Sequence, residues 1–158
     1  MRRTFAELLH SEMQKNEDIY LLTGDLGYVL WDQIRQDFPQ RFINTGSAEQ
    51  LLVGMSVGLA MEEKIPVLYS ITPFLLYRPF EIIRNYAHSE SIPIKLVGSG
   101  RNRDYGVAGP SHWAEEDQLV MKALPNIITS YPESKDEIKD LFHGFIYDKK
   151  PHYLNLRK

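Results

Sequence analysis

The sequence predicts a doubly wound α/β domain, in which helices flank a mostly parallel β-sheet. Short apolar runs bounded by Gly and Pro alternate along the chain with segments of helical periodicity, a pattern typical of strand–helix–strand units. The runs are apolar throughout, as is typical of parallel strands that are buried on both faces. A length of 158 residues suits a single core, so we expect one domain over residues 1–158.

The apolar runs give the expected strands, which are residues 19–23, 42–44, 66–70, 93–98, 126–131 and 152–156. Apolar residues recur at spacings of three and four between these runs, which predicts helices. The expected helices are residues 4–15, 30–38, 47–62, 74–89, 115–123 and 134–147. Ligands of doubly wound sheets bind beyond the carboxyl ends of the strands, so the segments that follow the strands are where functional residues are expected.

Composition excludes several classes of function. The net charge is −3, with Lys and Arg scattered along the chain, so a nucleic-acid-binding face is not expected. The absence of cysteine excludes disulfides, thiolate metal sites and cysteine nucleophiles, and it fits a cytoplasmic protein. No run approaches 18 apolar residues and no signal-peptide pattern opens the chain, so neither a membrane span nor secretion is expected.

The helix expected over residues 47–62 begins with Gly-Ser-Ala-Glu-Gln. Ser47 and Gln50 have capping-box spacing, which predicts Ser47 as the N-cap. Glu49 then lies in the first turn, where the helix dipole alone favours an acid by about 0.3–1 kcal/mol. The helix is apolar nearly all round, so both faces are expected to be buried. Gly54 and Gly58 share one face and indicate close approach of another backbone, either the sheet or a partner subunit.

Three aromatic residues follow the strand expected over residues 66–70. Phe74, Tyr77 and Phe80 are spaced by three and share a helical face. By its spacing alone, such a row is a stripe of the core.

A glycine-rich loop of about 15 residues follows the strand expected over residues 93–98, and loops of this length in compact domains are often functional. The loop ends at His112, which by its position alone is a capping or loop residue. Arg101 and Arg103 lie in the same loop. They are either solvated charges or ligands for an anion such as a carboxylate or a phosphate.

Taken together, these motifs resemble the pyrimidine-binding domain of transketolases and related thiamine-diphosphate enzymes, including 1-deoxyxylulose-5-phosphate synthase and the beta subunits of 2-oxoacid dehydrogenase E1. The resemblance covers nearly the whole chain. The motifs that carry it are Gly24-Asp25-Leu26, Phe38-Pro-x-Arg41-Phe-Ile-Asn44, Gly46-x-Ala-Glu49-Gln50, Gly54-x-x-x-Gly58-Leu-Ala60, Arg78-Pro-Phe80-Glu-Ile-Ile-Arg84 and Gly109-Pro-Ser-His112.

The resemblance implies roles for the residues that match. Glu49 is expected to hydrogen-bond N1′ of the cofactor's aminopyrimidine and so to favour the tautomer that deprotonates thiazolium C2. His112 is expected to face the substrate as a second catalytic residue. The resemblance also implies a cofactor-binding set, which is Asp25, Glu49, Phe74, Tyr77 and Phe80.

Other positions depart from the family. Val29, Ala108 and Trp113 stand where relatives have a phosphate-binding Ser, an acid and a Gln. Arg101 and Arg103 replace a set that contains His and Asp, so both are expected to bind substrate, as a carboxylate, a phosphate or a nucleotide-linked sugar.

The Gly-Asp-Gly…Asn motif that binds Mg²⁺ and diphosphate in the family is missing, and so is the third transketolase domain. We therefore expect no metal ligand in this chain. A separate diphosphate-binding subunit is expected to hold the Mg²⁺, in an α₂β₂ heterotetramer.

The function implied is that of a transketolase-like transferase, which passes a two-carbon ketol unit from a ketose to an aldehyde. Two alternatives stay open at this point. One is a subunit of a 2-oxoacid decarboxylase or E1-type enzyme, and the other is a non-catalytic regulatory homologue.

Overall fold

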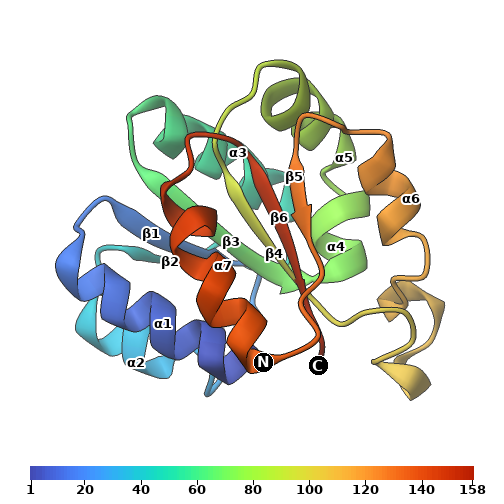
Figure 1. The fold of residues 1–158 in the computed structure, drawn as a ribbon, viewed down its shortest axis with the longest axis horizontal. Coiled ribbons are helices and arrows are strands. Elements are labelled where there is room, and N and C mark those ends of the chain that lie inside the picture. The colour runs from blue at the N-terminus through green and yellow to red at the C-terminus, as the bar shows by residue number, and fades with distance from the viewer.

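A single sheet of six parallel strands organises the computed structural model, which describes residues 1–158 (Figure 1). The strand order is β2-β1-β3-β4-β6-β5, and every pairing is parallel. The strands are β1 Ile19–Thr23, β2 Phe42–Asn44, β3 Ile65–Ile71, β4 Lys95–Ser99, β5 Ile128–Ser130 and β6 His152–Leu156. The predicted doubly wound α/β fold is confirmed, and each strand lies within a few residues of its expected place.

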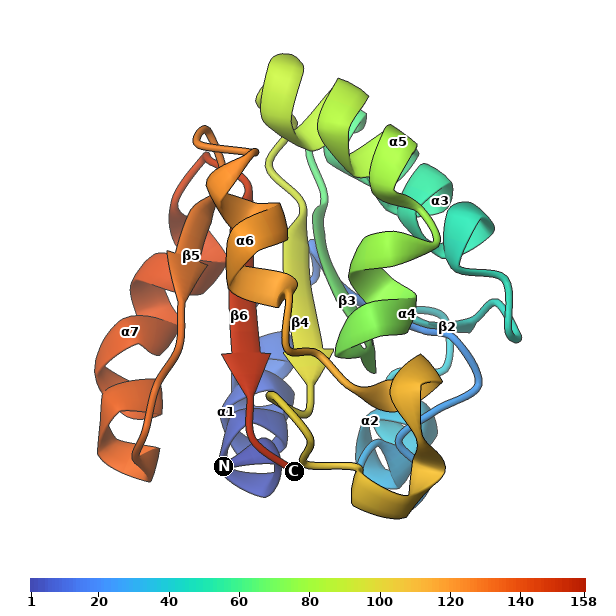
Figure 2. The same ribbon diagram turned by 90° about the vertical axis from the view of Figure 1, so that its right-hand side faces the viewer.

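Helices cover both faces of the sheet. The α-helices are α1 Arg2–Lys15, α2 Asp32–Asp37, α3 Glu49–Met61, α4 Thr72–Tyr77, α5 Phe80–Ile82, α6 Asp117–Lys122 and α7 Lys135–Tyr147. A π-helix, η1 Ile83–Ser89, continues α5, and the 3₁₀ turns η2 Gly106–Ala108 and η3 Pro110–His112 shape the loop after β4. Figure 2 shows α1 and α7 on one side of the strands and α3, α4 and α5 on the other. None of these helices combines the length and the apolar character that crossing a membrane requires.

The strands divide their side chains between two cores. Leu21, Val67 and Tyr69 pack with α1, α2 and α7, whereas Leu22 and Leu68 pack with α3, α4 and α6. Successive residues of a strand point to opposite faces, so a continuous apolar run fills both cores at once.

The helix expected over residues 74–89 is broken. It appears as α4, α5 and the π-helix η1, and Pro79 lies at the break between α4 and α5. Proline has no N–H to donate to the preceding turn, and its ring clashes with the helix backbone there.

The predicted N-cap Ser47 is wrong. The N-cap of α3 is Ala48, which makes no side-chain capping bond. Gly46, at a φ of 68°, turns the chain so that its carbonyl accepts the Ala48 N–H at 2.8 Å. The helix therefore starts later than the capping-box spacing indicates, and Glu49 becomes its first residue.

The outer face of α3 is exposed, contrary to the expectation that both faces are buried. Leu51 is 52% exposed and Met55 is 37% exposed. A methyl group added at Gly54 or Gly58 would meet no atom within 4 Å. The two glycines therefore do not approach the sheet of the same chain, and they face outward.

Candidate functional site

Glu49 lies buried beside the carboxyl ends of β1 and β3. Its side chain is 2% exposed. A methyl group at Gly24, the residue after β1, would lie 3.6 Å from Glu49 Oε1 and 3.8 Å from Ser70 Oγ. The Ser70 hydroxyl is buried and has no hydrogen-bond partner. A buried carboxylate and an unpaired hydroxyl thus flank the same point at the edge where ligands of such sheets bind.

Arg78 and Phe74 connect Glu49 to the glycine-rich loop. Arg78 Nη1 donates to Glu49 Oε2 at 2.9 Å, and the Arg78 guanidinium carbon lies 3.9 Å from the centre of the Phe74 ring. The Phe74 ring packs edge-to-face with His112, with 4.9 Å between ring centres. The structure therefore brings together Glu49, Phe74 and His112, three of the predicted site residues.

Tyr77 and Phe80 lie further along the same segment. The Tyr77 hydroxyl donates to Glu116 at 3.4 Å. Burial, helped by the negative charges of Glu116 and Asp117, raises the pKa of Tyr77 well above its ordinary value. Both aromatic rings pack against the core that α3, α4 and α6 share. The aromatic row is therefore divided, because Phe74 faces the site whereas Tyr77 and Phe80 also contribute to the core.

Asp25 follows Gly24 in the loop after β1. Asp25 accepts hydrogen bonds from the Tyr28 hydroxyl and, at 3.3 Å, from Asn44 Nδ2. These two bonds, that from Tyr28 first, hold the pKa of Asp25 below its ordinary value. Asp25 and Val29 have φ values of 58° and 67°, and such a conformation is uncommon for a β-branched residue.

Asn44 holds this loop against the turn that precedes α3. Its Oδ1 accepts the backbone N–H of Asp25 at 2.9 Å and that of Gly46 at 3.0 Å. Sequence reasoning missed this positioning residue, although an Asn that follows a short strand is a signal for backbone capping. Arg78 and Ser70 were not assigned to the site either, because Arg78 was identified only as part of a family motif and Ser70 only as the end of an expected strand.

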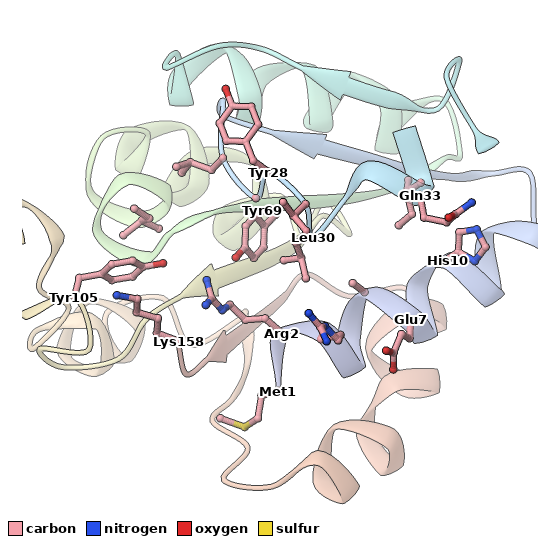
Figure 3. Close-up of a pocket in the computed structure, with 17 residues that line it drawn as sticks. Met1, Arg2, Glu7, His10, Tyr28, Leu30, Gln33, Tyr69, Tyr105 and Lys158 are labelled. Carbon is pink, nitrogen blue, oxygen red and sulfur yellow. The ribbon is translucent and has the colours of Figure 1, made fainter. Parts of the chain in front are cut away.

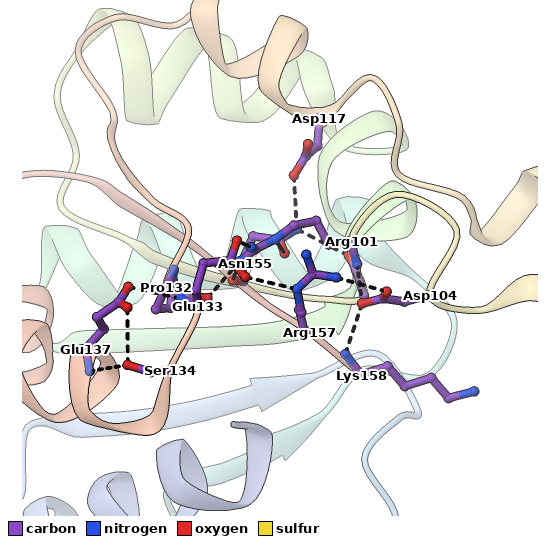
Figure 4. A network of polar contacts seen from close by, with 11 residues as sticks. Arg101, Asp104, Asp117, Pro132, Glu133, Ser134, Glu137, Asn155, Arg157 and Lys158 are labelled. Carbon is purple, nitrogen blue, oxygen red and sulfur yellow. Dashed lines mark hydrogen bonds and ion pairs between the residues drawn. The ribbon is translucent and has the colours of Figure 1, made fainter.

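Arg101 is a structural anchor for the loop that carries His112 (Figure 4). Its side chain is 4% exposed. It donates to Asn155 Oδ1 at 3.1 Å, to the Asn155 carbonyl at 2.9 Å and to the Pro132 carbonyl at 3.1 Å. A fourth bond, of 2.5 Å, joins it to Glu133. Most of its five donors are therefore committed to the protein, and we place Arg101 outside the proposed substrate contacts.

Arg103 lies on the outside of the same loop. Its side chain is 60% exposed, and its Nε pairs with Glu115 at 3.0 Å. The guanidinium carbon lies 4.3 Å from the centre of the Trp113 ring. Its substrate-binding role stays a prediction, and its exposure leaves it accessible to a ligand.

A groove of about 690 Å³ opens on the face of the sheet that α1 covers. Figure 3 shows Arg2, Tyr28 and Tyr69 along its wall, with Tyr105 and Lys158 at one end. The Tyr105 ring also lies 5.9 Å from the His112 ring, so the groove adjoins the His112 loop. The side chains of Arg2 and Lys158 give the groove a cationic lining that suits an anionic small molecule.

No group of three or more His, Cys, Asp and Glu side chains is arranged to hold a metal ion.

The chain is similar to several known proteins. A family profile described as the pyrimidine-binding domain of transketolase matches residues 1–158. A Methanocaldococcus jannaschii protein, provisionally named a transketolase C-terminal section, is 34% identical, with coverage of 96% of this chain and 50% of that protein. An apulose-4-phosphate transketolase subunit from Actinobacillus succinogenes is 32% identical, with coverage of 77% of this chain and 39% of that protein. The chain therefore spans half or less of the length of these relatives.

Solved structures show the same similarity. A split-gene transketolase, described as an inactive beta4 tetramer, is 30% identical and superposes with a TM-score of 0.86, covering 99% of this chain and 50% of that one. A Campylobacter jejuni transketolase superposes with a TM-score of 0.88 at 19% identity, over 99% of this chain and 25% of that one. The second match shows a shared fold alone. The resemblance predicted from the motifs is confirmed.

Proposed function

Because the chain belongs to the family of transketolase pyrimidine-binding domains, we propose that it is the pyrimidine-binding part of a heteromeric, thiamine-diphosphate-dependent transketolase. The proposed reaction transfers a two-carbon ketol unit from a ketose donor to an aldehyde acceptor. The observation that carries this proposal is the buried carboxylate of Glu49 at the carboxyl edge of the sheet, beside the Phe74 ring.

The residues present fit the aminopyrimidine half of thiamine diphosphate. A flat cation already pairs with Glu49 and stacks on Phe74, so this place accepts a flat group that donates a hydrogen bond. The Ser70 hydroxyl beside it is buried without a partner. When bound, the cofactor supplies the nucleophilic carbon and carries the two-carbon unit between substrates.

The residues of this chain then divide the remaining work. Glu49 holds a proton at the ring nitrogen N1′, and burial keeps water from competing for that bond. Phe74 supports one face of the ring. His112, next to Phe74, exchanges protons with the substrate oxygen. The groove lined by Arg2 and Lys158 attracts the anionic end of the substrate.

A partner subunit completes the site in this proposal. The outer face of α3 combines the exposed apolar side chains of Leu51 and Met55 with the open glycines Gly54 and Gly58. Such a face lets another backbone approach closely, which supports the partner-subunit alternative for the two glycines. We propose that this partner holds the Mg²⁺ and the diphosphate and that the assembly is an α₂β₂ heterotetramer. The cytoplasmic location stays a prediction.

The two alternative functions make different demands on Glu49. A non-catalytic homologue has no need for an acid at this place, so the presence of Glu49 at the carboxyl edge of the sheet argues against it. A 2-oxoacid decarboxylase or E1-type subunit uses the same acid. Assays of the complex with ketose phosphates and with 2-oxoacids distinguish this alternative from a transketolase.

The test uses the chain reconstituted with its diphosphate-binding partner. Glu49→Gln keeps the size of the side chain but cannot hold the proton in the same way. We expect turnover to fall by roughly 10²-fold or more, the usual contribution of a positioned proton-transfer group. Glu62→Gln, an exposed residue at the end of α3, is the matched control and should leave turnover unchanged. Near-normal turnover in Glu49→Gln would contradict the proposed function.

A further inference from the structure

The guanidinium of Arg78 makes two contacts at once in the site. It donates a hydrogen bond to Glu49 Oε2 at 2.9 Å, and its central carbon lies over the Phe74 ring, 3.9 Å from the ring centre. Hydrogen bonding to Glu49 and stacking on Phe74 are also the two interactions that the proposed function requires of the cofactor's aminopyrimidine. A planar group with N–H donors on its rim meets both requirements.

A bound aminopyrimidine and this position of Arg78 exclude each other. A ring that bonds Glu49 while it stacks on the face of Phe74 that Arg78 covers needs the space that the guanidinium fills. Arg78 also takes one of the two Glu49 oxygens. Two flat groups cannot occupy one space, so one has to leave before the other enters.

The pair is also asymmetric in burial, which decides which partner moves. The Glu49 side chain is 2% exposed, whereas that of Arg78 is 47% exposed. Glu49 is held by the first turn of α3. Arg78 belongs to the connection between α4 and α5, and its long side chain already reaches solvent. Rotation of the Arg78 side chain therefore empties the site without any change in the backbone.

We propose that Arg78 is a placeholder, which occupies the pyrimidine site of the cofactor-free protein and withdraws from Glu49 when thiamine diphosphate binds. The proposal rests on the proposed function. A buried carboxylate without a partner is costly, so the placeholder stabilises the empty site. In return it competes with the cofactor, because only the fraction of molecules in which Arg78 has withdrawn can bind it.

The test measures the affinity of the reconstituted complex for thiamine diphosphate by isothermal titration calorimetry. Arg78→Met keeps a long side chain but removes the competing donor. We expect the variant to bind the cofactor about threefold to tenfold more tightly than the wild type, as when a closed state that holds most molecules is removed. Arg84→Met removes an exposed arginine of the same segment whose side chain hydrogen-bonds to its neighbour Asn85, and this variant should not change the affinity.

A second measurement follows the thermal stability of the chain without its partner. Arg78→Met should lower Tm by roughly 4 °C or more, because Glu49 loses its buried partner. Adding Glu49→Gln to Arg78→Met should reverse most of this fall in Tm, because the buried side chain at position 49 is then uncharged. Arg78→Lys keeps the charge without the flat stacking surface, so its cofactor affinity should lie between those of the wild type and Arg78→Met.

Two results would overturn the placeholder. The first is binding of the cofactor to Arg78→Met or Arg78→Lys that is equal to or weaker than wild type, because Arg78 would then be neutral or a contact to the bound cofactor. The second is a Tm loss that Glu49→Gln does not reverse. A wild-type complex that binds no thiamine diphosphate would instead contradict the proposed function, so the two failures are distinguishable.

Discussion

Replacement of Arg101 by methionine tests whether this residue is an anchor of the His112 loop or a ligand for substrate. The side chain is 4% exposed, and three of its four bonds reach buried acceptors, namely Asn155 Oδ1, the Asn155 carbonyl and the Pro132 carbonyl. Methionine fills a similar volume but donates to none of them. Each buried acceptor left without a donor costs about 1 kcal/mol or more.

The free energy of unfolding should therefore fall by about 3–5 kcal/mol in Arg101→Met, a large part of the 5–15 kcal/mol that is typical of a domain. Urea denaturation at pH 7, followed by tryptophan fluorescence, measures the change. With a slope of about 2 kcal/mol per molar, the midpoint should fall by about 2 M urea.

Arg103→Met is the matched control, because it removes an arginine two residues away in the same loop. Its ion pair with Glu115 is exposed on both sides, so the expected loss is about 0–1 kcal/mol. If Arg101→Met destabilised the protein no more than Arg103→Met, the role of Arg101 as an anchor would be refuted. The predicted role in substrate binding would then regain its support.

Two further predictions concern stability away from the site. Burial lowers the pKa of Lys95 to about 8. Above that pH the unfolded chain binds more protons than the folded one. The free energy of unfolding should therefore rise by up to about 3 kcal/mol as the pH increases from about 8 towards 10. In Lys95→Met, the denaturation midpoint should change less with pH over this range. A pH dependence equal to that of the wild type would contradict the lowered pKa of Lys95. Gly98→Ala should lower the free energy of unfolding by about 1–3 kcal/mol, because the added methyl group would lie 2.7 Å from Thr72 Oγ1 and 3.0 Å from the Tyr153 hydroxyl. Gly144→Ala lies in α7, with no atom within 4 Å of the added methyl group, and it should instead stabilise the protein by about 1 kcal/mol. If calorimetry showed that Gly98→Ala and Gly144→Ala change the stability in the same direction, the packing argument would be refuted.

Local signals in the sequence accounted for most of the fold. The strands at Ile19–Thr23 and His152–Leu156 have the bounds that were predicted, because a strand buried on both faces carries a signal in nearly every residue. Phe42–Asn44 also has the predicted bounds, although this edge strand is only partly buried. The helix expected over residues 74–89 is instead broken at Pro79, although this proline can be read in the sequence. The apolar periodicity on both sides of Pro79 hid that break.

For the site, the family motifs predicted Glu49, Phe74 and His112. The structure connects the three through Arg78 and ring contacts, and their roles stay predictions. The sequence could not separate Arg101 from Arg103, since the two have the same charge in the same loop. The two arginines differ because Arg101 bonds to Asn155, which lies 54 residues away in the chain. Strand β6 brings the Asn155 amide beneath the loop.

The sequence by itself determined the order of strands and helices, the family motifs and the acid that opens α3, because periodicity, turn residues and short motifs act over a few neighbouring residues. The tertiary structure decided which groups face one another. It turned Gly54 and Gly58 outward, drew Arg101 into the interior and set the guanidinium of Arg78 between Glu49 and Phe74. Such contacts join residues that are distant in the chain, and their energies depend on burial and geometry that exist only once the sheet and its helices have packed.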